Sequence, residues 1–130
     1  MARTYINPGT ISSPGGRYTH VVRSGNMLFI SGQVSVDAAG NVVGAGDIEA
    51  QARQVYKNLE FALKAAGGSL SDIVKVTTYL TTRDSAAGIG KVRQEVWKND
   101  PPASTLLIIS GLANPAFLIE IDAIAVLSDR

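Results

Sequence analysis

Two acidic residues near the end of the chain are the first candidates for chemistry. Glu120 and Asp122 lie two residues apart in the segment FLIEIDAIAV (117–126), whose other eight residues are all apolar. In a β-strand this spacing places both carboxylates on the same face, because successive side chains alternate between faces. A buried carboxylate is costly unless it is paired or hydrogen-bonded, so the segment indicates either a functional site or a structural bond.

The composition limits the classes of function. The chain has 130 residues, of which 45% are hydrophobic, and this predicts a single domain spanning residues 1–130. It contains no cysteine, which excludes disulfides, thiolate catalysis and zinc sites built on cysteine. The formal net charge is +1 without a basic cluster, so no nucleic-acid partner is expected. No apolar stretch approaches the ~18 residues of a membrane span, so we expect a cytoplasmic protein without membrane contact.

Hydrophobic periodicity predicts the elements that position the acids. Helical spacing runs from an N-cap at Asp47 to a stop at Gly67, and a second helix is expected over 84–99. Strands are expected at 18–23, 27–36, 71–80, 104–110 and 117–127, with room for one more before the first helix. Residues 1–16 contain several prolines and glycines and are expected to form turns. This order favours an α+β fold, in which a mixed sheet carries both helices on one face.

Two helices cannot cover both faces of such a sheet. In the last strand, the face with the acids also carries Leu118, Ile124 and Val126. An exposed apolar face is a liability, and packing sheet against sheet between copies of the chain removes it. We therefore expect self-association, with Glu120 at or near a subunit interface.

Ser31 and Gly32 stand inside the strand expected over 27–36. Glycine weakens a strand, so Gly32 indicates a bulge or a close approach by another backbone or a ligand. No histidine–acid pair is recognisable around Ser31, so a serine nucleophile is not expected.

The chain as a whole resembles the reactive intermediate deaminase (Rid, YjgF-type) family. The matching segments are YTHVV, NMLFISGQVSVD, EAQARQVYKNLEFALKAAGGSLSDIVKVTTYL, PPAST and IEIDAIAV, in the family's order and at its spacing. The resemblance implies a chorismate-mutase-like fold and a homotrimer whose sheets form a central barrel. It also implies three clefts between subunits, in which an enamine or imine is hydrolysed to a ketone and ammonia without metal or organic cofactor.

The resemblance assigns residues to the cleft. Glu120 matches an acidic position, where a carboxylate of raised pKa could act as a base or position water. Tyr18 matches a tyrosine that lines the cleft, and Ser31 and Gly32 match a pair that leaves room for a polar substrate group. The alternative for Glu120 is a structural, hydrogen-bonded acid. Asp122 is expected to form a hydrogen bond or ion pair between subunits.

One position departs from the family pattern. Ala103 stands where the resemblance implies an arginine that clamps a substrate carboxylate, and a methyl group cannot form that pair. Arg93, on the second expected helix, and Arg17, next to Tyr18, are candidates to replace the lost cation. The alternative for both is a solvated surface arginine.

These residues predict a deaminase that hydrolyses a small imine or enamine other than the standard 2-imino acids. Its substrate is a small molecule that can carry a carboxylate, and its only expected protein partner is itself. The alternative is a non-catalytic trimer that binds metabolites or proteins, which the missing arginine favours. A ribonuclease, the activity ascribed to some relatives, is disfavoured because the charge is near neutral and no His–His or His–Lys constellation exists.

Overall fold

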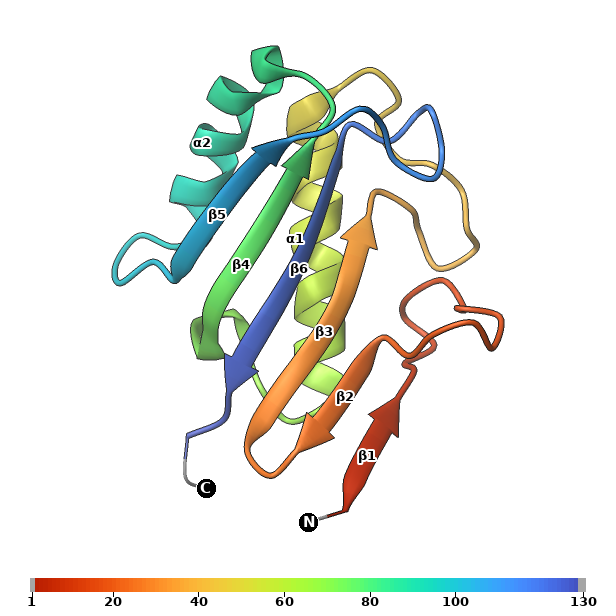
Figure 1. Cartoon of the computed structure of the whole chain (residues 1–130), viewed down its shortest axis with the longest axis vertical. Coiled ribbons are helices and arrows are strands. Elements are labelled where there is room, and N and C mark those ends of the chain that lie inside the picture. Colours follow the sequence, from red (N-terminus) through yellow and green to blue (C-terminus); the bar gives the residue numbers. More distant parts are fainter. Residues whose placement is uncertain (1, 129–130) are drawn as a thin grey trace.

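A six-stranded mixed sheet carries two helices on one face, as the computed structural model of the chain shows for residues 2–128 (Figure 1). The strands are β1 (Arg3–Ile6), β2 (Val21–Ser24), β3 (Met27–Val34), β4 (Ile73–Leu80), β5 (Ala103–Ile108) and β6 (Ile119–Val126). The helices are α1 (Ile48–Ala65) and α2 (Ala86–Val96), with short 3-10 turns at Leu70–Asp72 and Arg83–Ser85. The spatial order is β1-β2-β3-β6-β4-β5, and only the β4–β5 pair is parallel. This is the predicted α+β fold.

Three predicted elements differ from the structure. The strand expected over 18–23 begins only at Val21, so Tyr18 precedes β2 and is not part of a strand. The turn-rich N-terminal segment contains strand β1, which pairs antiparallel with β2 at one edge of the sheet. Its four residues, RTYI, are mostly exposed. Because no face of the strand is buried, its sequence shows no alternation of apolar and polar residues that would predict a strand. The second helix is shorter than expected, because a 3-10 turn precedes Ala86 and Trp97 is already extended.

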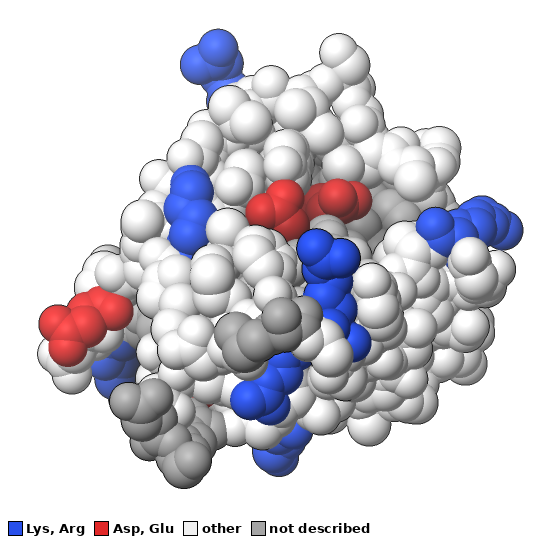
Figure 2. Space-filling view, turned by 60° about the horizontal axis from the view of Figure 1, so that its bottom comes forward, with Lys and Arg blue, Asp and Glu red and all other residues white. Residues whose placement is uncertain are grey.

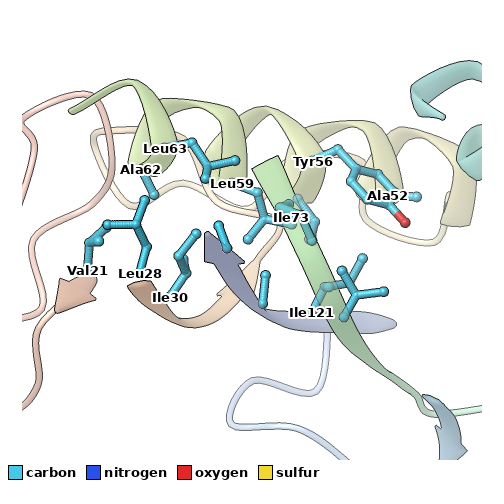
Figure 3. Packing of buried hydrophobic residues seen from close by; sticks show 14 of the residues in the cluster. Val21, Leu28, Ile30, Ala52, Tyr56, Leu59, Ala62, Leu63, Ile73 and Ile121 are labelled. Carbon is cyan, nitrogen blue, oxygen red and sulfur yellow. The ribbon is translucent and has the colours of Figure 1, made fainter. Parts of the chain in front are cut away.

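Helix α1 contributes more buried apolar side chains to the core than α2 does. Asp47 caps α1 as predicted, its side chain accepting a hydrogen bond from the Ala50 N–H. Figure 3 shows Leu59 and Leu63 of α1 pointing toward strand residues such as Leu28 and Ile121. Burial of these aliphatic side chains fixes the helix on one face of the sheet. No helix among residues 2–128 has the length and apolar character needed to cross a membrane.

Strand β6 lies in the middle of the sheet, between β3 and β4. Every second residue from Ile119 to Ala125 is buried beneath the helices, as alternation predicted. The residues between them, including Glu120 and Asp122, face the side without helices. The two acids therefore share one open face with the side chains of the neighbouring strands.

That open face and the β5 edge expose apolar surface. Phe29 of β3 and Leu107 of β5 are 43% and 44% exposed, and all six residues of β5 are exposed. An apolar edge strand of this kind is normally covered in a stable protein. The surface therefore supports the expected self-association without identifying the number of subunits.

Gln51 of α1 fixes the chain segment that leads into β6. Its side chain is fully buried, and its Nε2 donates to the carbonyls of Gly44 (3.2 Å) and Ala116 (2.8 Å). Its Oε1 accepts from the Leu118 N–H at 2.8 Å. One amide thus satisfies three backbone groups and anchors the entry to the strand that bears Glu120.

Gln51→Ala is expected to destabilise the protein by about 2–4 kcal/mol, because it leaves buried backbone groups without partners. Urea unfolding followed by circular dichroism measures this loss. Gln94→Ala, at an exposed position of α2, is the matched control and should change the free energy of unfolding by less than about 0.5 kcal/mol. Equal effects of the two substitutions would contradict the role of Gln51.

Candidate functional site

Glu120 is the centre of the candidate site. It pairs in register with Val34 of β3 and Tyr79 of β4, so it lies in the middle of the open face. Its side chain is half-buried, and no hydrogen-bond donor of residues 2–128 reaches its carboxylate. Figure 2 shows acidic side chains gathered in a hollow of one face, with Lys and Arg side chains elsewhere on the same face. Such a carboxylate is available to a ligand.

Gly32 lies against the Glu120 side chain. The β3–β6 register shifts between Ile30 and Gln33, so a bulge occurs at this point of β3. A Cβ added at Gly32 would overlap the Glu120 carboxylate, lying 2.7 Å from its Cδ. The predicted bulge is confirmed, whereas the group that approaches Gly32 closely is the Glu120 side chain and not another backbone or a ligand. Only glycine leaves room for the carboxylate at this position.

A cavity of about 480 Å³ opens in front of Glu120. Its walls bring together four predicted residues, Tyr18, Ser31, Gly32 and Glu120, and add the candidate cation Arg17. Val34, Ala113 and Phe117 complete the lining. The cavity thus combines one acid, one guanidinium and two hydroxyl groups with apolar walls.

The Ser31 hydroxyl has a fixed orientation. It donates to the Thr19 carbonyl at 2.6 Å, while the Ser31 N–H donates to the His20 carbonyl at 2.9 Å. Since the hydroxyl proton is already used, the oxygen offers its lone pairs to the cavity. Ser31 can therefore accept a hydrogen bond from the N–H of a bound molecule.

Two effects raise the pKa of Glu120 above its ordinary value. Burial is the larger, and the negative charge of Asp122 on the same face adds to it. Asp122 itself accepts a hydrogen bond from the Tyr79 hydroxyl at 3.0 Å, and this bond is the main reason why the pKa of Tyr79 is raised. Within its own chain Asp122 bonds to Tyr79, and the expected bond between subunits stays a prediction. Glu120 is therefore a stronger base than an exposed glutamate.

Within a single chain, neither Ala103 nor Arg93 lines this cavity. Ala103 begins β5 and is exposed, opposite Lys75 of β4. The Arg93 guanidinium donates to Thr78 Oγ1 at 3.4 Å, and Thr78 is buried on the helix-covered face. Of the two candidate replacement cations, the structure places only Arg17 beside Glu120.

Sequence reasoning missed Ala113 and Phe117 as cavity residues. By alternation Phe117 belongs to the face of the expected last strand opposite the acids, so its residue type and position indicate core packing and not a cavity. Ala113 is in the loop before β6, where neither residue type nor spacing indicates a site. Both are placed by the segment that Gln51 holds through the Ala116 carbonyl and the Leu118 N–H. Within residues 2–128 no three His, Cys, Asp or Glu side chains gather as metal ligands.

Comparison with known proteins shows the family. The family model described as Endoribonuclease L-PSP matches residues 10–127. A RutC family protein of Pyrococcus horikoshii is 40% identical over 112 residues, covering 86% of this chain and 88% of that protein. Among solved structures, a Rid family protein of unknown function from Yersinia pestis is 30% identical, with a TM-score of 0.92 and coverage of 97% and 100%. RidA from an Antarctic Psychrobacter is 29% identical, with a TM-score of 0.89 and coverage of 95% and 99%.

The fold and the comparisons define an α+β protein of the chorismate-mutase-like type. The chain belongs to the Rid (YjgF-type) family, to which the Endoribonuclease L-PSP model corresponds. The resemblance drawn from the sequence is therefore confirmed.

The raised pKa of Glu120 predicts a pH-dependent effect on stability. An acid whose pKa is higher in the folded than in the unfolded chain binds more protons when folded, so the contribution of Glu120 to stability falls as pH rises above about 4.5. Glu120→Gln lacks this penalty. Its melting temperature should exceed that of the wild type by about 1–3 °C at pH 7, with the difference vanishing below pH 4.5.

Glu60→Gln, at an exposed position of α1, is the matched control and should show no such pH-dependent difference. Differential scanning calorimetry at pH 4 and pH 7 gives the comparison. A Glu120→Gln variant that is less stable than the wild type at pH 7 but not at pH 4 would show that the Glu120 charge is stabilised, not penalised.

Proposed function

We propose that this protein hydrolyses the C=N bond of a small imine or enamine to give a ketone and ammonia. The observation that carries the proposal is a half-buried carboxylate of raised pKa, without a bonding partner among residues 2–128, facing a cavity beside the Ser31 hydroxyl. Membership of the Rid family supports it.

The chemistry follows from the positions of the groups. Glu120 accepts a proton from water while the water oxygen attacks the carbon of the protonated imine, which gives a neutral carbinolamine. Glu120 then returns this proton to the amine nitrogen. The C–N bond breaks to release ammonia, and the carbinolamine hydroxyl gives its proton to Glu120 as it becomes the ketone. Ser31 Oγ accepts a hydrogen bond from the substrate N–H and holds the C=N carbon next to Glu120. A base works best when its pKa is near the working pH, so the raised pKa of Glu120 suits this role.

The distribution of positive charge at the site, with none at Ala103 and one at Arg17, supports a substrate other than the standard 2-imino acids. Ala103 offers no charge next to the reacting carbon, so a carboxylate attached directly to that carbon loses its clamp. Arg17 lies at the exposed rim of the cavity and can pair with an anionic group at the far end of a substrate. Solvent weakens such a pair, which makes it an aid to binding and not a requirement.

The proposal includes assembly into a homotrimer with a central barrel. The exposed apolar face and the uncovered β5 edge support it, since association would bury both. The clefts would then lie between subunits, with Ala103 of one chain available to the cavity of the next.

A non-catalytic trimer that binds small metabolites is the second candidate. Ala103 favours it, because the cation implied at this position by the family resemblance is absent. Ligand binding without accelerated hydrolysis would distinguish this candidate from the deaminase.

Glu120→Gln should lower the rate of imine hydrolysis by at least about 100-fold, because the amide keeps the shape and loses the base. Imines released by an amine oxidase are allowed to react with semicarbazide, and the protein's activity is the decrease in trapped product. Light scattering on a sizing column should give about three times 13.6 kDa for both proteins. Glu60→Gln is the control with unchanged activity, and normal turnover by Glu120→Gln would remove Glu120 from the mechanism.

Ala103→Arg should increase activity on 2-imino acids released by an amino-acid oxidase by roughly tenfold, through a charge-assisted contact to the substrate carboxylate. The wild type should be slower on these imines than on those without a carboxylate. An unchanged rate in a trimeric Ala103→Arg variant would show that this position does not face the cavity.

A further inference from the structure

A second chamber lies directly behind the candidate site. It has a volume of about 200 Å³, and four of its lining residues, Tyr18, Gly32, Val34 and Phe117, also line the outer cavity. The two spaces therefore adjoin across these four residues. Nothing in the chemistry proposed for Glu120 uses the inner chamber.

The part of the chamber lining that is not shared with the outer cavity suits an apolar group. Ile11 and Val36 contribute aliphatic surface. Three polar residues, Ser12, His20 and Gln33, also line the chamber. His20 and Gln33 are buried, and their side-chain nitrogens are bonded to protein atoms: His20 Nε2 to the Ser12 carbonyl (2.7 Å) and His20 Nδ1 to Gln33 Nε2 (3.0 Å). Gln33 Nε2 also donates to the Ser31 carbonyl at 3.1 Å. Because these nitrogens already have partners, an apolar guest leaves none of them unsatisfied.

Tyr18 is placed to control the passage between the two spaces. It is 50% exposed, and its ring meets the His20 ring edge-on at 5.5 Å between centroids. An exposed aromatic ring of this kind can change rotamer at low cost. Phe117, which is buried and lines both spaces, adds an apolar surface to the passage.

We propose that the inner chamber binds an apolar arm of the substrate while the C=N group remains beside Ser31 and Glu120. Only the position of the C=N group depends on the proposed function, and the binding of the arm in the chamber does not. A cavity of about 150 Å³ is known to hold benzene, so a chamber of about 200 Å³ accepts a branched aliphatic or phenyl group. The substrate class is thus an imine with an apolar arm of four to six carbon atoms (an approximate range set by that volume), which agrees with the absence of a clamp for a carboxylate.

Ketones test this inference without turnover, because they are the product class and carry the same arms. Calorimetric titration of the wild type should show that 4-methylpentan-2-one binds about tenfold tighter than butan-2-one, as two buried carbon atoms predict. The polar probe 4-hydroxybutan-2-one should bind no tighter than butan-2-one. Equal affinities for all three ketones would overturn the proposal.

Val36→Phe adds bulk to the lining of the chamber and should abolish the tenfold gain, while leaving the affinity for butan-2-one within about twofold. Val42→Phe is the matched control, since Val42 bridges to Val36 across the same turn but lines neither space. The control should keep the gain. Loss of the gain in both variants would show that the hairpin, and not the chamber, was disturbed.

Methyl NMR of the wild type provides a readout that needs no variant. The phenyl ring of acetophenone, a six-carbon arm, should shift the methyl signals of Ile11 and Val36, whereas shifts confined to Ala113 at the outer cavity would overturn the proposal. The two proposals can fail separately. If affinity depends on the arm but the protein has no hydrolytic activity, the proposed catalysis is wrong and the binding role of the chamber stands. If the protein hydrolyses imines but affinity does not depend on the arm, the proposed catalysis stands and the binding role of the chamber is wrong.

Discussion

The contact between the Glu120 carboxylate and the backbone at Gly32 determines the character of this site. It needs a glycine, because any side chain would overlap the carboxylate, and it occurs at the bulge in β3. It also withdraws Glu120 partly from water, which raises the pKa of this acid together with the nearby charge of Asp122. A glutamate on a regular, exposed strand would have neither the enclosure nor the basicity that the proposed chemistry uses.

The two faces of the sheet have different roles. The helix-covered face contains the aliphatic core and supplies the stability that holds β6 in the centre of the sheet. The other face has no helix, so it exposes apolar residues such as Phe29 and Leu107 around the two acids. Placing the acids there avoids burying two charges in the core, and it leaves them on the surface best suited to association and ligand binding.

Regular features of the sequence predicted much of this arrangement. Alternation along 117–127 placed Glu120 and Asp122 on the same open face, and the interior position of Gly32 indicated the bulge. The rest depends on tertiary contacts that no local pattern encodes. The direction of Arg93 follows from how α2 rotates against β4, and the Asp122–Tyr79 bond from the register between β4 and β6. Strand β1 is stabilised by its pairing with β2, and its own residues do not predict a strand.

The central claim is that Glu120 is a base made stronger by its enclosure and by Asp122. The most direct measurement is the titration of the Glu120 side-chain carboxyl by carbon-13 NMR, in the wild type and in Asp122→Asn. The account predicts a wild-type pKa above 4.5, and a lower value in Asp122→Asn that still exceeds 4.5, since burial is the larger cause. A wild-type pKa at or below 4.5 would contradict the account.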